Sequence, residues 1–207
     1  MKKSLIIFLF IILSLSQTFA QQKELTYSHK WSLVFGMTQP LLLDGFNFAV
    51  NYTTNRWVFE YSHGVSLNYE GPALRSAYEG QIISLESPYS TGPGVGYRFF
   101  SNDILGLDVR AEAKLHQYNV QLNQTQSIKY RNFDLGGGVY LQIRPFGKST
   151  KAIKGIVIEP SIRYWANVSS SLEDNFTYLN PEGMSSTHNP YPLDLFANIS
   201  IGYTFGN

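Results

Sequence analysis

The chain has 207 residues, no cysteine and a net charge of +1; 15% of its residues are charged and 15% are aromatic. The lack of cysteine excludes a disulfide framework and a lipid-modified N-terminus, and the near-neutral charge provides no electrostatic surface for nucleic acid. Soluble proteins carry about 25% charged residues, so this composition favours a surface that faces lipid.

The N-terminal segment has the three parts of an export signal. Lys2 and Lys3 precede an apolar run over residues 5–15, and small residues follow at positions 18–20. This order predicts a signal peptide over residues 1–20. An uncleaved anchor is the alternative, but the run is shorter than the roughly 20 residues of a membrane-spanning helix. We therefore expect a single exported domain over residues 21–207.

Eight later segments alternate between apolar and polar residues with the period of two that is typical of a β-strand. The last segment is the clearest, because only Phe196 interrupts its polar face, and it is long enough to cross a bilayer at a tilt. Pro160 in the seventh segment predicts a bulge or a local break. The eight predicted strands are residues 31–37, 45–52, 56–68, 92–99, 104–118, 130–144, 155–167 and 193–205.

The connections between these segments alternate in length. Short connections at 53–55, 100–103 and 145–154 follow the even-numbered strands, and longer ones follow the odd-numbered strands. Outer-membrane barrels have short periplasmic turns and longer extracellular loops, and an even strand number places both termini on one side. We therefore predict an all-β fold, an eight-stranded antiparallel up-and-down transmembrane β-barrel, with residues 69–91 and 168–192 as its most exposed loops.

The polar face of these strands predicts a filled lumen. Charges of alternating sign recur at every second position from Asp108 to His116. An eight-stranded barrel has an interior just wide enough for side chains to fill, so we expect these charges to pair across it as a structural network. The alternative is a soluble sandwich or lipocalin-like barrel whose polar face meets water. The ten charged residues on this face are Glu60, Arg98, Asp108, Arg110, Glu112, Lys114, Asp134, Arg144, Glu159 and Arg163.

Two local features belong to this expectation. Glu159 and Arg163 are four residues apart in one strand, so both face inward, and we expect them to form a structural ion pair. Glycines at 94, 96 and 136–138 suit close packing or sharp curvature of a small barrel wall.

The signal peptide, the eight alternating strands, the alternating connections and the terminal Tyr203-Thr204-Phe205 resemble the small outer-membrane β-barrel proteins, the group that includes the OmpA transmembrane domain and OmpX-like barrels. The resemblance covers nearly the whole mature chain. It implies a monomer in contact with outer-membrane lipid, inserted by the barrel-assembly machinery, which in that group reads a terminal aromatic residue. Here Gly206 and Asn207 follow Phe205, so the chain departs from the strict terminal signal.

Candidate catalytic and metal-binding groups are few. The lipid A deacylase among such barrels uses a His–Ser pair, for which His63 and Ser66 are the closest candidates, but three residues apart in a strand they are expected on opposite faces. We expect His116 in the lumen network, and His29 and His188 have no neighbour at a recognisable metal-ligand spacing. No phosphate-binding glycine loop or nucleophile elbow is present.

These observations predict a non-enzymatic outer-membrane barrel, with no metal or other cofactor, that displays its longer loops for binding or for a surface role. The sequence does not identify the ligand. Two alternatives remain: an enzyme that modifies outer-membrane lipid, such as a lipid A deacylase, and a narrow solute channel, which the paired lumen opposes.

Overall fold

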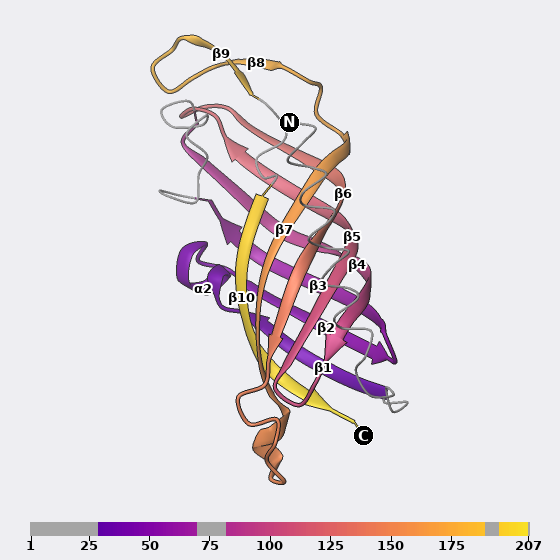
Figure 1. Cartoon of the computed structure of the whole chain (residues 1–207). Coiled ribbons are helices and arrows are strands. Elements are labelled where there is room, and N and C mark those ends of the chain that lie inside the picture. The colour runs from indigo at the N-terminus through magenta and orange to yellow at the C-terminus, as the bar shows by residue number, and fades with distance from the viewer. Residues whose placement is uncertain (1–28, 70–81, 189–194, 207) are drawn as a thin grey trace, which may run out of the picture.

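The computed structural model describes residues 29–69, 82–188 and 195–206, so the predicted signal peptide and the start of the mature chain lie outside the described residues. Eight strands form a closed antiparallel barrel in which neighbours in sequence are neighbours in space (Figure 1). The predicted eight-stranded up-and-down barrel is therefore confirmed. The strands are β1 (His29–Gly36), β2 (Phe46–Thr54), β3 (Trp57–Asn68), β4 (Ser84–Ser101), β5 (Leu105–Gln121), β6 (Ser127–Ile143), β7 (Ile156–Ser170) and β10 (Leu195–Phe205).

The first and last strands close the cylinder, as expected. Trp31 of β1 pairs with Phe205 of β10, and Phe35 pairs with Ile201. We call the end that holds the short connections the turn end, and the opposite end the loop end. The connections at the turn end are residues 55–56, 102–104 and 144–155.

Four smaller elements lie in the connections. At the loop end, α2 (Thr38–Leu42) joins β1 to β2, and β8 (Phe176–Leu179) pairs with β9 (Ser185–His188) in a separate hairpin. At the turn end, the 3₁₀ turn η3 (Ala152–Gly155) precedes β7. Figure 1 shows the hairpin beyond the strands at one end and the η3 connection beyond them at the other.

The predicted start of β4 at residue 92 is wrong, because the strand begins at Ser84. Pairing with β5 shifts register between Glu86 and Tyr89, and a bulge of this kind breaks the alternation on which the prediction rests. The local break expected at Pro160 occurs on one side of β7. Pro160 pairs with Ile199 of β10, but the pairing of β7 with β6 is interrupted between Ser161 and Ile158, without a register shift.

Large apolar side chains cover the outer wall of the barrel. Ile162 is 61% exposed and Leu195 is 64% exposed, although both belong to regular strands. Such a surface is unusual for a soluble protein, in which large contiguous apolar patches are rare. Other exposed residues of the wall include Trp31, Trp57, Phe59, Tyr61, Leu135, Val139, Tyr164 and Ile199.

The two faces of β5 exchange character part of the way along the strand. From Leu105 to Leu115 the apolar side chains point outward and the charged ones inward. Beyond that point Gln117 faces outward, whereas Tyr118 and Val120 are buried. The strand stays paired with β6 in one register throughout.

The same exchange occurs in β6 at the same height. Phe133, which pairs with Leu115, is the last apolar residue on the outer wall, and the next outward residue toward the loop end is Arg131. Tyr130 beside it is only 2% exposed. In β5 and β6 the outside is thus apolar and the inside polar below this height, and the reverse holds above it.

The loop end contains an apolar core that we call the cap. It joins the upper parts of β3 to β6 with the β1–β2 connection and the β8–β9 hairpin. Leu67 belongs to it, although strict alternation places this residue outward. Ser66 adopts a φ of 52°, and Leu67 beyond it is buried, although β3 and β4 keep one register. The cap residues are Leu43, Leu67, Tyr69, Ile82, Leu85, Tyr118, Val120, Leu122, Tyr130 and Tyr178.

Candidate functional site

The centre of the barrel interior is an ion cluster around Arg110. Its Nη1 lies 2.5 Å from Glu60 Oε2, and its Nη2 lies 2.9 Å from Asp108 Oδ2 and 2.8 Å from Glu159 Oε2. The Tyr140 ring covers the guanidinium, with its centroid 3.9 Å from Cζ. Arg110 is 1% exposed. One arginine therefore links strands β3, β5 and β7 across the lumen.

A second arginine continues this cluster toward the turn end. Arg98 binds Asp108 with two hydrogen bonds, Nε to Oδ1 at 2.7 Å and Nη2 to Oδ2 at 3.0 Å. Arg144 instead donates to neutral oxygens, the Asn102 carbonyl at 2.6 Å and the Gln142 Oε1 at 2.9 Å. Arg144, one of the ten predicted lumen residues, thus lies in the network without a carboxylate contact.

Lys114 and Glu112 form the next layer toward the loop end. Lys114 Nζ lies 3.2 Å from Glu112 Oε2 and 3.6 Å from Glu60 Oε1, and it donates a hydrogen bond to the Ser62 hydroxyl. Glu112 also accepts hydrogen bonds from the Tyr140 hydroxyl and from Trp165 Nε1, the latter at 3.3 Å. The layer is connected to the Arg110 cluster through Glu60 and Tyr140.

His116 and Asp134 mark the upper limit of the polar interior. His116 Nε2 lies 3.3 Å from Asp134 Oδ2, and Asn167 donates to the other carboxylate oxygen at 2.7 Å. The His116 ring stacks on Tyr118 of the cap, with centroids 5.8 Å apart. His116 therefore lies in the lumen network, at its boundary with the cap.

Arg163 does not form the expected ion pair with Glu159, which binds Arg110 and Gln142 instead. The Arg163 guanidinium lies against two aromatic rings, with Cζ 5.7 Å from the Tyr140 centroid and 5.4 Å from the Trp165 centroid. Within the described residues it has no carboxylate within ion-pair distance, although it is only 6% exposed. The predicted Glu159–Arg163 ion pair is wrong because side chains from other strands reach both residues: Arg110 binds Glu159, and aromatic rings contact Arg163.

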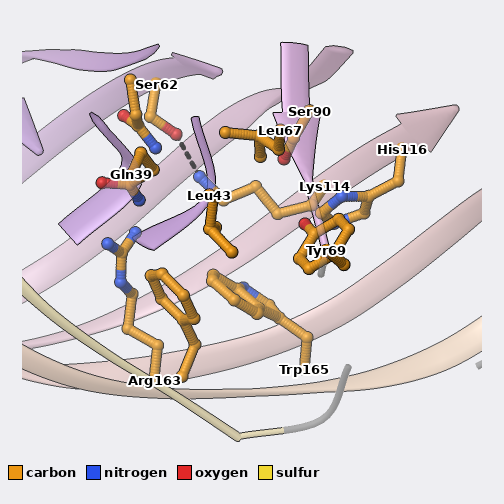
Figure 2. Close-up of a pocket in the computed structure, with 12 residues that line it drawn as sticks. Gln39, Leu43, Ser62, Leu67, Tyr69, Ser90, Lys114, His116, Arg163 and Trp165 are labelled. Carbon is orange, nitrogen blue, oxygen red and sulfur yellow. Dashed lines mark hydrogen bonds between the residues drawn. The ribbon is translucent and has the colours of Figure 1, made fainter. Parts of the chain in front are cut away.

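A small cavity separates the polar interior from the cap (Figure 2). Its volume is about 30 Å³, which suits one or two water molecules. Gln39 and Arg163 face each other across it, and Gln39 Oε1 and Arg163 Nε are buried without a protein hydrogen-bond partner. The predicted filled polar lumen is confirmed, and the cavity is too small for a larger solute.

Inward-facing glycines make room for the largest side chains of the lumen. A Cβ at Gly96 would lie 2.5 Å from Arg110 Cγ, and one at Gly138 would lie 2.6 Å from Arg163 Cγ. This agrees with the close packing expected of these glycines.

The β8–β9 hairpin carries a buried histidine that sequence patterns did not reveal. His188 is fully buried, its Nε2 lies 3.1 Å from the Tyr130 hydroxyl, and its ring contacts that of Tyr178. Burial lowers the pKa of His188 to about 4. The sequence signal that could have identified the hairpin is the short alternation around Tyr178, which lies inside the predicted loop 168–192.

His63 and Ser66 do not form a catalytic pair in this structure. His63 packs against Phe48 on the outer wall, with ring centroids 5.8 Å apart, and no hydrogen bond among the described residues joins it to Ser66. The positive φ of Ser66 interrupts the strict alternation that predicted opposite faces for the two side chains. His29, in contrast, contacts the Tyr52 hydroxyl at the turn end.

The described residues contain no group of three or more His, Cys, Asp or Glu side chains arranged to hold a metal ion. None of the helices in the described ranges is long and apolar enough to cross a membrane.

No family model and no curated protein matches this chain. Among solved structures it is similar to Neisserial surface protein A (NspA), with 12% identity, coverage of 87% of this chain and 95% of that chain, and a TM-score of 0.46. It is also similar to Ail, the attachment invasion locus protein of Yersinia pestis, with 17% identity, 86% and 95% coverage and a TM-score of 0.43. A major outer membrane protein from Thermus thermophilus gives 8% identity, 86% and 99% coverage and a TM-score of 0.46.

At these identities the likeness concerns the fold alone. The predicted resemblance to small eight-stranded barrels holds at that level, as the strand pairing of this chain establishes.

Proposed function

We propose that this chain is an outer-membrane β-barrel protein whose ordered cap is displayed at the cell surface for binding. The observation that carries the proposal is the exchange of apolar and polar faces above Leu115 and Phe133. The outward apolar stretch of β5 ends at Leu115, and β10 is 11 residues long. A tilted transmembrane strand needs roughly 9–11 residues. Below the exchange the outer face of β5 and β6 suits lipid, and above it this face suits water.

The connections set the orientation. The turn end faces the periplasm and the loop end faces the medium, because outer-membrane barrels have short periplasmic turns and longer extracellular loops. Strand β5 has 17 residues, so it extends well beyond the bilayer on the loop side. The displayed part is therefore a folded unit with its own apolar core and a hairpin.

The role of this unit is binding without catalysis or transport. The lumen at membrane depth is occupied by the Arg110 cluster, in which one guanidinium contacts three carboxylates, so a conducting path would have to break ion pairs. His63 has no hydrogen bond to Ser66, which removes the nearest candidate for a deacylase pair. The surface of the cap and the β8–β9 hairpin is what remains to meet a partner.

Two measurements test the location and the orientation. The purified protein in detergent should migrate differently in gels before and after boiling and should fractionate with outer membranes; an unchanged mobility together with a soluble periplasmic fraction would overturn the proposal. The chain has no cysteine, so single cysteines report accessibility cleanly. Leu179→Cys in the hairpin should react with an impermeant maleimide in whole cells, and Lys151→Cys at the turn end should react only after lysis.

A further inference from the structure

The charges of the described residues are sorted along the barrel axis. The lumen holds equal numbers of acidic and basic residues, whereas the two ends differ in sign. At the loop end the acidic residues outnumber the basic ones, Lys129 and Arg131. At the turn end Asp103 is the one acidic residue in the described ranges. The basic residues at the turn end are Lys30, Arg56, Lys148, Lys151 and Lys154.

The η3 connection presents exposed basic residues at the rim of the barrel. Lys148, Lys151 and Lys154 are exposed. The Tyr203 hydroxyl donates a hydrogen bond of 2.8 Å to the Ala152 carbonyl, and Tyr203 belongs to the outward face of β10. Ala152 of the connection is therefore fixed against the wall that faces lipid.

Exposed apolar side chains lie among these lysines. Phe146 is 45% exposed and Ile153 is 42% exposed. An apolar surface interspersed with lysines is the pattern of segments that lie at a membrane interface, with apolar side chains in the acyl boundary and ammonium groups at the phosphates. The η3 connection has this composition at the rim of the barrel.

The wall beside the connection carries aromatic residues suited to the same depth. Trp31 pairs with Phe205, next to Tyr203. Farther round the rim, Arg56 donates a hydrogen bond of 3.2 Å to the Tyr97 hydroxyl and lies over its ring. Tryptophan and tyrosine prefer the headgroup region of a bilayer. The cations of the turn end thus lie at the height of the lipid phosphates.

We propose that residues 145–154 form a binding surface for anionic phospholipid headgroups of the periplasmic leaflet. The inference rests on the proposed membrane location and adds the headgroup class and the leaflet. Lysine binds phosphate as a point charge, and several basic residues near an anionic surface act together. The acidic loop end has the opposite sign, so the preference belongs to one end of the barrel.

The tryptophans of the chain provide the probe. Trp31 and Trp57 are exposed on the wall at the turn end, whereas Trp165, the third, is buried in the lumen. The folded protein is placed in phosphatidylcholine vesicles that contain an equal small fraction of either brominated phosphatidylglycerol or brominated phosphatidylcholine. Quenching of tryptophan fluorescence then gives the relative affinity of the two lipids for the wall near the turn end.

The wild type should favour phosphatidylglycerol by at least about threefold, and the preference should decline at high salt. The Lys148→Gln/Lys151→Gln/Lys154→Gln variant should lose most of it, and the matched Lys129→Gln/Arg131→Gln variant at the loop end should keep it. Heat-dependent gel mobility checks that each variant is folded. Equal quenching by both lipids in the wild type, or a preference that survives the triple substitution, would overturn this inference alone. Absence of quenching by either lipid would overturn the proposed membrane location as well.

Discussion

Leu115 of β5 and Phe133 of β6 are cross-strand partners on the outer wall, and both strands exchange their apolar and polar faces directly above this pair. No bulge interrupts the β5–β6 pair, which keeps one register on both sides of the exchange, whereas the pairings of β4 with β5 and of β6 with β7 shift register at this height. A single sheet therefore serves two environments. Its lower part places charges inside and apolar side chains outside, and its upper part does the opposite.

The burial of β5 residues in the cap predicts that an aspartate will destabilise the protein at an inward position of the strand and have little effect at an outward one. Val120 is 1% exposed in the cap, whereas Gln117 faces outward just above the exchange. Val120→Asp should destabilise the loop end by roughly 3 kcal/mol, because it buries an unpaired carboxylate. Gln117→Asp should change stability by less than about 0.5 kcal/mol. Limited proteolysis of the β8–β9 hairpin and unfolding in guanidinium measure the stability of both variants. Equal protease resistance of the two variants would refute the packing role of Val120 in the cap.

Arg110 should dominate the stability of the lumen. Arg110→Met leaves three carboxylates without their shared cation. It should cost about 3–5 kcal/mol, because the carboxylates stay buried and lose the charge that compensates their desolvation. Arg131→Met, an exposed arginine of the neighbouring strand, should cost less than about 0.5 kcal/mol. Unfolding in guanidinium, followed by tryptophan fluorescence, gives both values.

A second substitution separates electrostatics from misfolding in this experiment. Arg110→Met/Glu159→Gln removes one of the stranded charges, so it should recover part of the stability that Arg110→Met loses. A double variant less stable than Arg110→Met would show that Glu159 has a role beyond its contact with Arg110.

The glycines opposite the large lumen side chains predict a steric effect. Gly96→Ala would bring a Cβ to 2.5 Å from Arg110 Cγ and 2.8 Å from the Val109 carbonyl oxygen, so it should cost about 1–3 kcal/mol. Gly64→Ala is the matched control, because the nearest atom to its Cβ lies at 3.5 Å. The same unfolding assay compares the two variants, and equal stabilities would contradict the packing role of Gly96.

The period of two predicted the eight strands and the inward set of charged residues, because each strand at membrane depth separates apolar and polar side chains cleanly. It did not predict the cap. In β5 the apolar set moves from odd to even positions between Leu115 and Tyr118, and in a single sequence this shift resembles the end of a strand. The shift itself is readable, because Tyr118 and Val120 continue the alternation on the other face.

The partners within the lumen were beyond sequence reasoning for a different reason. Alternation places Glu159 and Arg163 on the same face, but the distance across a narrow barrel is as short as the distance along a strand. Arg110 from β5 therefore reaches Glu159, and Arg163 packs against aromatic rings. Strand register and the positions of small residues decide such pairs, and neither follows from the pattern of one strand.

The buried histidine of the hairpin predicts a pH dependence confined to the loop end. The pKa of His188 falls from an ordinary value near 6.5 to about 4 in the folded hairpin, because burial disfavours its charged form. A lowered pKa means that its contribution is complete above pH 6.5 and is lost as the pH falls toward 4. Hydrogen exchange at the Thr177–Thr187 pair of β8 and β9 should therefore accelerate between pH 6.5 and 4, after correction for the intrinsic rate. His188→Phe should remove this acceleration, and His29→Phe at the turn end should leave it intact. Exchange at this pair that stays constant over the range in the wild type would contradict the role of His188 as the residue that fixes the hairpin to Tyr130.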